Sequence, residues 1–155
     1  MKKVITGCLL ASVFIFSSCE KSDEDSGPLT KMDMLTNSEW QFAGHTEIYY
    51  VDGQWWDAPN DVFANLDSCG RDFTLNFKKD GDLIQDWPCL FDEVKVSNWS
   101  FNSDETELIF EEQGIILPVH HLDSLSENTL MLSEEIDLGW QDYKVLYHYK
   151  YTAVE

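Results

Sequence analysis

The feature that most constrains the fold is an alternation of apolar and polar residues between Arg71 and Trp87. Apolar residues occupy every second position from Phe73 to Phe77, and a period of two is typical of a strand with one buried face. The run Lys78-Lys79-Asp80-Gly81 follows, and its Asp-Gly pair is a strong turn signal between two strands. This segment therefore predicts an antiparallel hairpin.

Two cysteines, Cys69 and Cys89, flank the predicted hairpin. Counting outward from the turn places them within a residue or two of facing each other, which suits the short Cα–Cα separation of a disulfide. Closing a loop of about twenty residues would stabilise the fold by roughly 3 kcal/mol in the chain-entropy model. A redox or metal role is the weaker interpretation, because there is no Cys-x-x-Cys pair and no histidine at ligand spacing.

The same strand-and-turn pattern continues along the chain, and no segment shows a capped helical stripe of apolar residues. We therefore expect an all-β fold, an eight-stranded up-and-down antiparallel barrel. Closure removes exposed strand edges and leaves an interior that side chains fill or that holds one small ligand. The expected strands are 39–51, 71–77, 82–87, 95–101, 107–111, 115–125, 129–134 and 142–152.

The amino end has the layout of a secretory signal: Lys2 and Lys3 precede an apolar run of thirteen residues, 4–16, which is short for a transmembrane helix. The ending Phe16-Ser17-Ser18-Cys19 resembles the lipobox of bacterial lipoproteins, in which the signal is cut before the cysteine and the cysteine is acylated. Phe16 stands where leucine is usual. The resemblance implies lipidation at Cys19; the alternative is an ordinary signal peptide whose Cys19 pairs elsewhere.

We divide the chain into a signal peptide of the lipoprotein type, 1–18, an acidic flexible tether, 19–34, and a barrel domain, 35–155. Residues 20–27 are too charged and too poor in apolar side chains to fold. Ser22-Asp23-Glu24-Asp25 resembles the signal that sends lipoproteins of the Bacteroidetes to the outer cell surface. We expect an outer-membrane lipoprotein that faces the cell exterior. A periplasmic location, with a merely solvated acidic linker, is the alternative.

Charge excludes some partners. The chain has 29 acidic and 10 basic residues, a formal net charge of −19. Nucleic acid and anionic membrane surfaces should repel such a chain, so we expect no nucleic-acid partner. The expected partners are the membrane, through the lipid anchor, a small apolar ligand, and a protein of the envelope.

Three sets of short motifs occur along the chain from about Leu35: Leu35-Thr36-Asn37-Ser38-Glu39-Trp40, Phe73-x-Leu75-x-Phe77-x-x-Asp80-Gly81 between Cys69 and Cys89, and Asn98-Trp99-Ser100-Phe101-x-x-Asp104. In these motifs the chain resembles the lipocalin-like lipoproteins of Bacteroidetes. The resemblance implies a barrel and, by analogy of fold only, binding of a small apolar or amphiphilic ligand. Two features depart from the lipocalin pattern: Ser38 stands where Gly-x-Trp would place glycine, and no arginine lies in the last strand to cover Trp40.

Four tryptophans are the candidate ligand contacts. In an up-and-down barrel, every second connection lies at the same end. The longest expected connection, 52–70, therefore shares one end of the barrel with the end of the strand 82–87 and the start of the strand 142–152. Long connections of this kind are usually lids or disordered. The four candidates are Trp55, Trp56, Trp87 and Trp140. Aromatic rings at a barrel mouth suit an apolar ligand; the alternative is that they plug the barrel end as core.

The alternative function is a structural or interaction protein that has a barrel filled by Phe42, Ile48, Phe73, Leu75, Phe77 and Trp99. An enzyme is not expected, because no nucleophile elbow, phosphate loop or Ser-His-Asp set is visible. His120 and His121 are adjacent and would point to opposite faces of a strand, so they cannot chelate one ion. We expect no metal site and no cofactor.

Overall fold

The computed structural model describes residues 28–56, 58–89, 94–139 and 143–154, and these form a closed antiparallel barrel. Each of eight strands pairs with the next along the chain, and the last strand pairs with the first. The predicted all-β fold with eight antiparallel barrel strands is confirmed. The barrel strands are β1 (Glu39–Val51), β4 (Thr74–Phe77), β5 (Asp82–Asp86), β6 (Lys95–Phe101), β7 (Glu107–Glu112), β9 (His120–Leu125), β10 (Thr129–Asp137) and β11 (Lys144–Val154).

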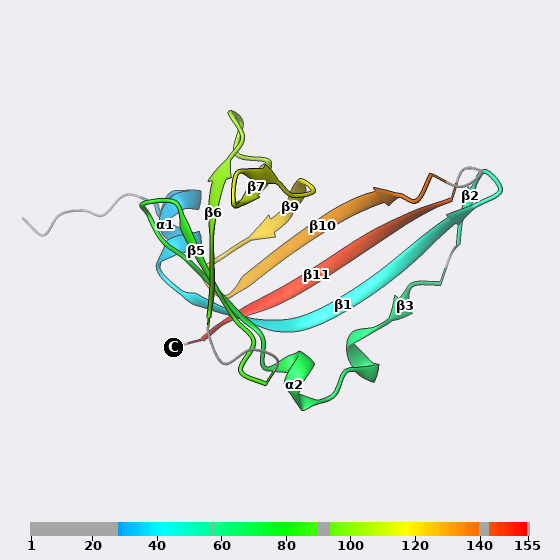
Figure 1. Cartoon of the computed structure of the whole chain (residues 1–155), viewed down its shortest axis with the longest axis horizontal. Helices are drawn as coiled ribbons and strands as arrows, with labels where there is room; N and C mark the ends of the chain where they lie inside the picture. The colour runs from blue at the N-terminus through cyan, green and yellow to red at the C-terminus, as the bar shows by residue number, and fades with distance from the viewer. Residues whose placement is uncertain (1–27, 57, 90–93, 140–142, 155) are drawn as a thin grey trace, which may run out of the picture.

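The shorter elements lie outside the barrel wall or at its ends. Figure 1 shows α1 at one end of the long strands β1, β10 and β11, and β2 at the other. We call the end with α1 the closed end and the opposite end, where the β1–β4, β5–β6 and β7–β9 connections lie, the open end. The shorter elements are α1 (Lys31–Thr36), β2 (Gln54–Trp55), β3 (Asn60–Asp61), the 3₁₀ turn η1 (Phe63–Asn65), α2 (Ser68–Arg71) and β8 (Ile115–Ile116).

The closed end is densely packed and carries most of the core. Leu35 of α1 and Trp40 of β1 have no exposed surface. The Trp40 indole Nε1–H donates to the Leu35 carbonyl at 2.8 Å, and the Trp99 indole donates to the Lys78 carbonyl at 3.0 Å. Both bonds satisfy polar groups that would otherwise be costly to bury. The helix and the two indoles therefore fix this end of the barrel.

Helix α1 begins in the stretch that the sequence analysis assigned to the tether, 19–34, and continues into the expected barrel domain; no helix was expected there. Thr30 and Asp33 form a capping box: each side chain accepts a hydrogen bond from the other residue's backbone N–H. Asp33 also pairs with Lys79 at 2.7 Å, and the hydrogen bond from Lys79 lowers the pKa of Asp33 to about 2. The short helix is held to the barrel by the Asp33–Lys79 pair and by burial of the Leu35 side chain.

The connection between β1 and β4, expected as a lid-like loop, runs instead along the free edge of β1. Strand β3 pairs with β1 at Thr46 and Glu47, and β2 pairs at Tyr50 and Val51. One edge of β1 is thus paired with β11 along its length, and the other is covered in turn by β4, β3 and β2. Covering a long strand edge in this way protects it from pairing with other chains.

Candidate functional site

A cavity of about 380 Å³ lies inside the barrel toward its open end. This volume is in the range of small-molecule sites. The lining comes from strands on both sides of the barrel and from the connections at the open end, which contribute Leu66, Gly70 and Leu117. The other lining residues are Phe42, His45, Phe73, Leu75, Leu83, Gln85, Trp87, Phe110, His120, Leu132, Tyr149 and Tyr151.

A β-bulge in β1 decides which of its side chains face this cavity. Phe42 pairs with Tyr151, the register shifts between Phe42 and Gly44, and His45 then pairs with Tyr149. Directly opposed residues of an antiparallel pair share a face of the sheet. The bulge adds one residue to β1, so the inner face passes from Phe42 to His45 instead of to Gly44.

Beyond the bulge, the inner face of β1 becomes polar. Glu47 pairs with Tyr147, which shares the inner face of β11 with Tyr149, whereas Ile48 pairs with Leu146 on the other face. The sequence analysis placed Ile48 inside a filled barrel, and the structure corrects this. Simple alternation from Phe42 would have put Ile48 inside, but the extra residue moves Glu47 and Tyr49 there instead.

Four residues on adjacent strands form what we call the polar wall: His45, Tyr149, Glu134 and His120. Tyr149 lies between the two histidines, with ring centroids 4.9 Å from His45 and 5.8 Å from His120. Glu134 is only 6% exposed, although it is a carboxylic acid. Buried carboxyl groups are rare unless they have partners, so the polar wall is a costly arrangement at the side of the cavity.

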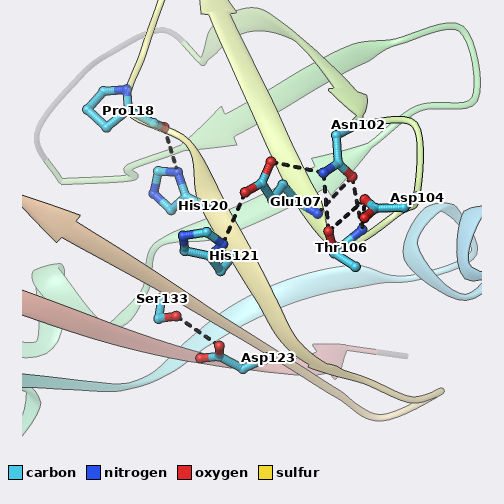
Figure 2. A network of polar contacts seen from close by, with 9 residues as sticks. All are labelled: Asn102, Asp104, Thr106, Glu107, Pro118, His120, His121, Asp123 and Ser133. Carbon is cyan, nitrogen blue, oxygen red and sulfur yellow. Dashed lines mark hydrogen bonds and ion pairs between the residues drawn. The ribbon is translucent and has the colours of Figure 1, made fainter.

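The contacts of His120 place a shared proton between its ring and Glu134. The Pro118 carbonyl lies 3.0 Å from Nδ1 of His120 (Figure 2) and can only accept, so Nδ1 carries a proton. Nε2 lies 3.4 Å from the Glu134 carboxylate, a contact that is attractive only if one further proton lies between them. Burial lowers the pKa of His120 and raises the pKa of Glu134, whereas a hydrogen bond from Tyr149 acts to lower the pKa of Glu134. Each residue thus satisfies the other.

His45 differs from its neighbours because it lacks a polar partner. Its Nε2 is the only buried side-chain nitrogen or oxygen, among the described residues, that makes no hydrogen bond. Burial lowers the pKa of the His45 imidazole, while the nearby Glu47 carboxylate acts to raise it. An unpaired buried polar group destabilises a protein by about 1–3 kcal/mol. The ring is held mainly by aromatic contacts, including Tyr147 at 5.7 Å and Phe42 at 6.2 Å.

Further toward the open end, Glu47 and Tyr49 continue the polar inner face. The Tyr49 hydroxyl donates a hydrogen bond to the Glu47 carboxylate. This bond is the main reason that the pKa of Tyr49 rises to about 12. Both phenols near this carboxylate, Tyr49 and Tyr147, have raised pKa values and therefore remain protonated and uncharged at neutral pH.

The opposite side of the cavity is mainly apolar, and we call its apolar residues the apolar wall: Phe73, Leu75, Leu83 and Trp87. The first three are buried, and the rings of Phe73 and Trp87 stack with centroids 4.0 Å apart. Gln85 of β5 also lines this side, and its amide donates to the Ser97 hydroxyl at 3.1 Å. The cavity thus has polar side chains of β1, β9 and β11 on one side and mainly apolar side chains at β4 and β5 on the other.

The predicted disulfide is present and joins two connections at the open end. Cys69 lies in α2, and Cys89 follows β5, with the two Cα atoms 5.5 Å apart. Gly70, next to Cys69, and Trp87, two residues before Cys89, both line the cavity. The disulfide therefore fixes two segments of the cavity wall to each other.

The structure separates the tryptophans that the sequence analysis grouped at one rim. Trp87 lines the cavity, but Trp55 and Trp56 line a separate surface recess with Val51, Asp52, Gln54 and Ala58. Trp55 and Trp56 are 40% and 58% exposed and pack against Tyr50 and Tyr49. Trp140, like the lipidation candidate Cys19, lies outside the described residues.

The outer face of β9 carries a second set of polar contacts, shown in Figure 2. His121 faces Glu107 at 3.3 Å, and Ser133 donates to Asp123 at 2.8 Å. His121 is 56% exposed at its side chain, whereas His120 is largely buried, so the two histidines lie on opposite faces of the strand. Within the described part of the chain, no three His, Cys, Asp or Glu residues are grouped so that they could hold a metal ion.

The sequence matches no protein-family model and no characterised protein. Among the described residues, no helix is both long enough and apolar enough to span a membrane.

Sequence reasoning missed the polar wall. The residue types were visible, but His45 and Glu134 lie on strands far apart in the chain, and the bulge that turns His45 inward has no clear sequence signal beyond Gly44. Only the strand pairing brings these residues together.

Proposed function

We propose that this protein binds a small molecule of largely apolar surface, held non-covalently inside the barrel. The observation that carries this proposal is the cavity of about 380 Å³ between the polar wall and the apolar wall. Native interiors are normally packed with few voids larger than a water molecule. By volume, this cavity corresponds to roughly a dozen waters.

The packing of the rest of the barrel supports the proposal. Phe77 and Trp99, two of the residues expected to fill the barrel, pack edge to face near the closed end with centroids 5.1 Å apart. Filling is thus complete in one half of the barrel and incomplete in the other. The disulfide holds the cavity wall in place before any ligand binds, which lowers the entropy cost of binding.

Binding is favoured over catalysis by the composition of the cavity lining. Among the described lining residues there is no serine, threonine, cysteine, aspartate or glutamate. The two ionisable pairs nearest the cavity, His120 with Glu134 and Tyr49 with Glu47, are engaged with each other.

The proposal includes a place for the protein: an envelope lipoprotein anchored through Cys19 and exposed on the outer membrane, with the periplasmic face as the alternative. The lipobox-like sequence before Cys19 and the acidic residues after it support this location. Replacing Cys19 with serine should move the protein from the membrane fraction to the soluble fraction. Retention of the variant in the membrane fraction after a salt wash would contradict lipid anchoring.

Native mass spectrometry tests the binding proposal. The exported Cys19→Ser protein needs no detergent, and the substitution lies outside the residues that the structure describes. A non-covalent mass excess that disappears on denaturation is expected. Leu117→Trp, which narrows the cavity, should reduce this excess, whereas the adjacent Ile116→Trp, at a site 66% exposed, should not. No excess in the parent protein, or equal loss in both variants, would count against a ligand in the cavity.

A further inference from the structure

We propose that the ligand of this cavity is an uncharged, largely apolar molecule that carries a hydroxyl group, and that the hydroxyl forms a hydrogen bond with the imidazole of His45. This inference rests on the proposed function and names the class of ligand. It follows from three features: the unused hydrogen-bonding capacity of His45, the absence of lysine and arginine among the described residues that line the cavity, and the division of the cavity into two walls.

The polar atoms of the other polar-wall residues are already engaged. His120 contacts the Pro118 carbonyl with one nitrogen and Glu134 with the other. Tyr149 forms a hydrogen bond with Glu134. His45 lines the cavity, yet its Nε2 has no partner in the described structure. His45 is therefore the polar-wall residue that is free to recognise a ligand.

The imidazole can present a nitrogen to the cavity from either edge. A half-turn of the ring about the Cβ–Cγ bond exchanges Nε2 with Cε1 and Nδ1 with Cδ2, with almost no change in shape. Whichever edge faces the cavity, one of these two orientations places a nitrogen there. The aromatic contacts with Tyr149 and Tyr147 are compatible with both orientations, because stacking depends on the plane of the ring.

A hydroxyl group suits a neutral imidazole better than other head groups do. Burial keeps His45 uncharged, so one of its nitrogens donates and the other accepts. A hydroxyl both donates and accepts, and it can therefore pair with the imidazole in either tautomer. A carbonyl or ether only accepts and would match only one tautomer.

An ionised carboxylate is a poor fit to the same site. No lysine or arginine is among the described residues that line the cavity. Lys95 on β6 is paired with Glu112 at 2.6 Å. Glu47 and Glu134 share the inner face with His45, and burying a carboxylate near them without a counter-charge is strongly unfavourable.

The two walls also set the orientation of the ligand. Its hydroxyl would face His45 and Tyr149 on the polar wall, and its hydrocarbon body would contact the apolar wall. Phe73, Leu75 and Leu83 are at most 6% exposed in the folded protein, so they offer a dry surface to the ligand.

The test compares three eight-carbon compounds with different head groups: n-octanol, n-octyl chloride and octanoate. Each displaces the neutral fluorescent probe N-phenyl-naphthylamine from the exported Cys19→Ser protein at neutral pH. Octanol should compete at a concentration about tenfold lower than octanoate, because the carboxylate must be buried without a counter-charge. One hydrogen bond should make octanol bind about threefold to tenfold tighter than octyl chloride.

Variants identify the residue. His45→Phe should weaken octanol binding by about threefold to tenfold and leave octyl chloride within about twofold. His45→Gln keeps a donor and an acceptor and should retain most of the octanol affinity. His121→Phe, at an exposed position on the outer face, is the matched control and should change neither affinity.

The outcomes separate this inference from the proposed function. Octanoate binding as tightly as octanol would overturn the hydroxyl assignment, and equal losses for octanol and octyl chloride in His45→Phe would overturn the role of His45. If the probe and all three compounds fail to bind the parent protein, the proposed function itself is wrong.

Discussion

Replacing His45 with phenylalanine should stabilise the ligand-free protein, although it removes a polar residue from the proposed binding site. The phenyl ring keeps the aromatic contacts with Tyr149, Tyr147 and Phe42, at 4.9, 5.7 and 6.2 Å. It also removes a buried nitrogen that has no hydrogen-bond partner. The change therefore costs little packing and relieves a desolvation penalty.

The size of the effect follows from that penalty. An unpaired buried polar group costs about 1–3 kcal/mol, and the lower value applies because only part of the imidazole is buried. An increase of about 1 kcal/mol in the free energy of unfolding corresponds to a rise of about 4 °C in the melting temperature for a domain of this size. In urea, the unfolding midpoint should rise by about 0.5 M with an unchanged slope.

The pH dependence gives an independent check with a defined sign. The folded pKa of His45 is lowered from its ordinary value of 6.5, so below that pH the unfolded chain binds a proton that the folded protein resists. The wild-type protein therefore loses stability from this residue as the pH falls below 6.5, and His45→Phe does not. The difference between them should grow in mild acid.

Urea unfolding followed by circular dichroism, at neutral pH and in mild acid, measures both effects. His121→Phe, on the exposed outer face, should shift the midpoint by less than half as much. A lower midpoint for His45→Phe than for the wild type, with the slope unchanged, would refute the reasoning. It would mean that the imidazole has a stabilising partner in solution.

Three further predictions concern the disulfide, Glu134 and Trp87. Replacing Cys69 and Cys89 with alanine opens a loop with a sequence separation of 20 and should lower the free energy of unfolding by about 3 kcal/mol, measured in urea; a loss below about 1 kcal/mol would contradict the chain-entropy estimate. The folded pKa of the Glu134 carboxyl group is raised above its ordinary 4.5, so this group favours the folded state below pH 4.5 and the contribution is lost as the pH rises through the folded pKa. Glu134→Gln should abolish this decline in stability, and an unchanged pH profile in the variant would argue against a buried carboxyl group. Trp87→Phe should remove most of the ligand-induced change in tryptophan fluorescence, whereas Trp55→Phe should preserve it; the reverse result would move the ligand to the surface recess.

Much of the barrel was predictable because its strands carry local signals. The predicted bounds of β1, 39–51, and of β6, 95–101, agree with the structure, and the Asp80-Gly81 turn lies between β4 and β5 as expected. The disulfide followed from counting residues outward from that turn. These features depend on alternation and turn chemistry, which a single segment of sequence contains.

Features that depend on contacts between distant segments were not predictable. Helix α1 has a visible capping pair, Thr30 and Asp33, but it is too short to show an apolar stripe and depends on the barrel for burial of Leu35. Trp55 was grouped with Trp87 because both lie on connections at one end of the barrel. Pairing of β2 with β1 instead carries Trp55 to a separate recess.

The bulge between Phe42 and Gly44 acts on β1 as a frameshift acts on a coding sequence. Before the bulge, the even-numbered Trp40 and Phe42 face inward and belong to the core. After it, the odd-numbered His45 and Glu47 face inward and supply the polar groups on the cavity side of the strand. Substitutions after the bulge can therefore change the side chains that line the cavity while Trp40 and its neighbours keep the fold. Deleting Ala43, the extra residue at the shift, would remove the bulge but leave His45 and Glu47 on the inner face, because plain alternation from Phe42 would then place them there. The local bend would be lost while the polar character of the cavity wall stayed the same.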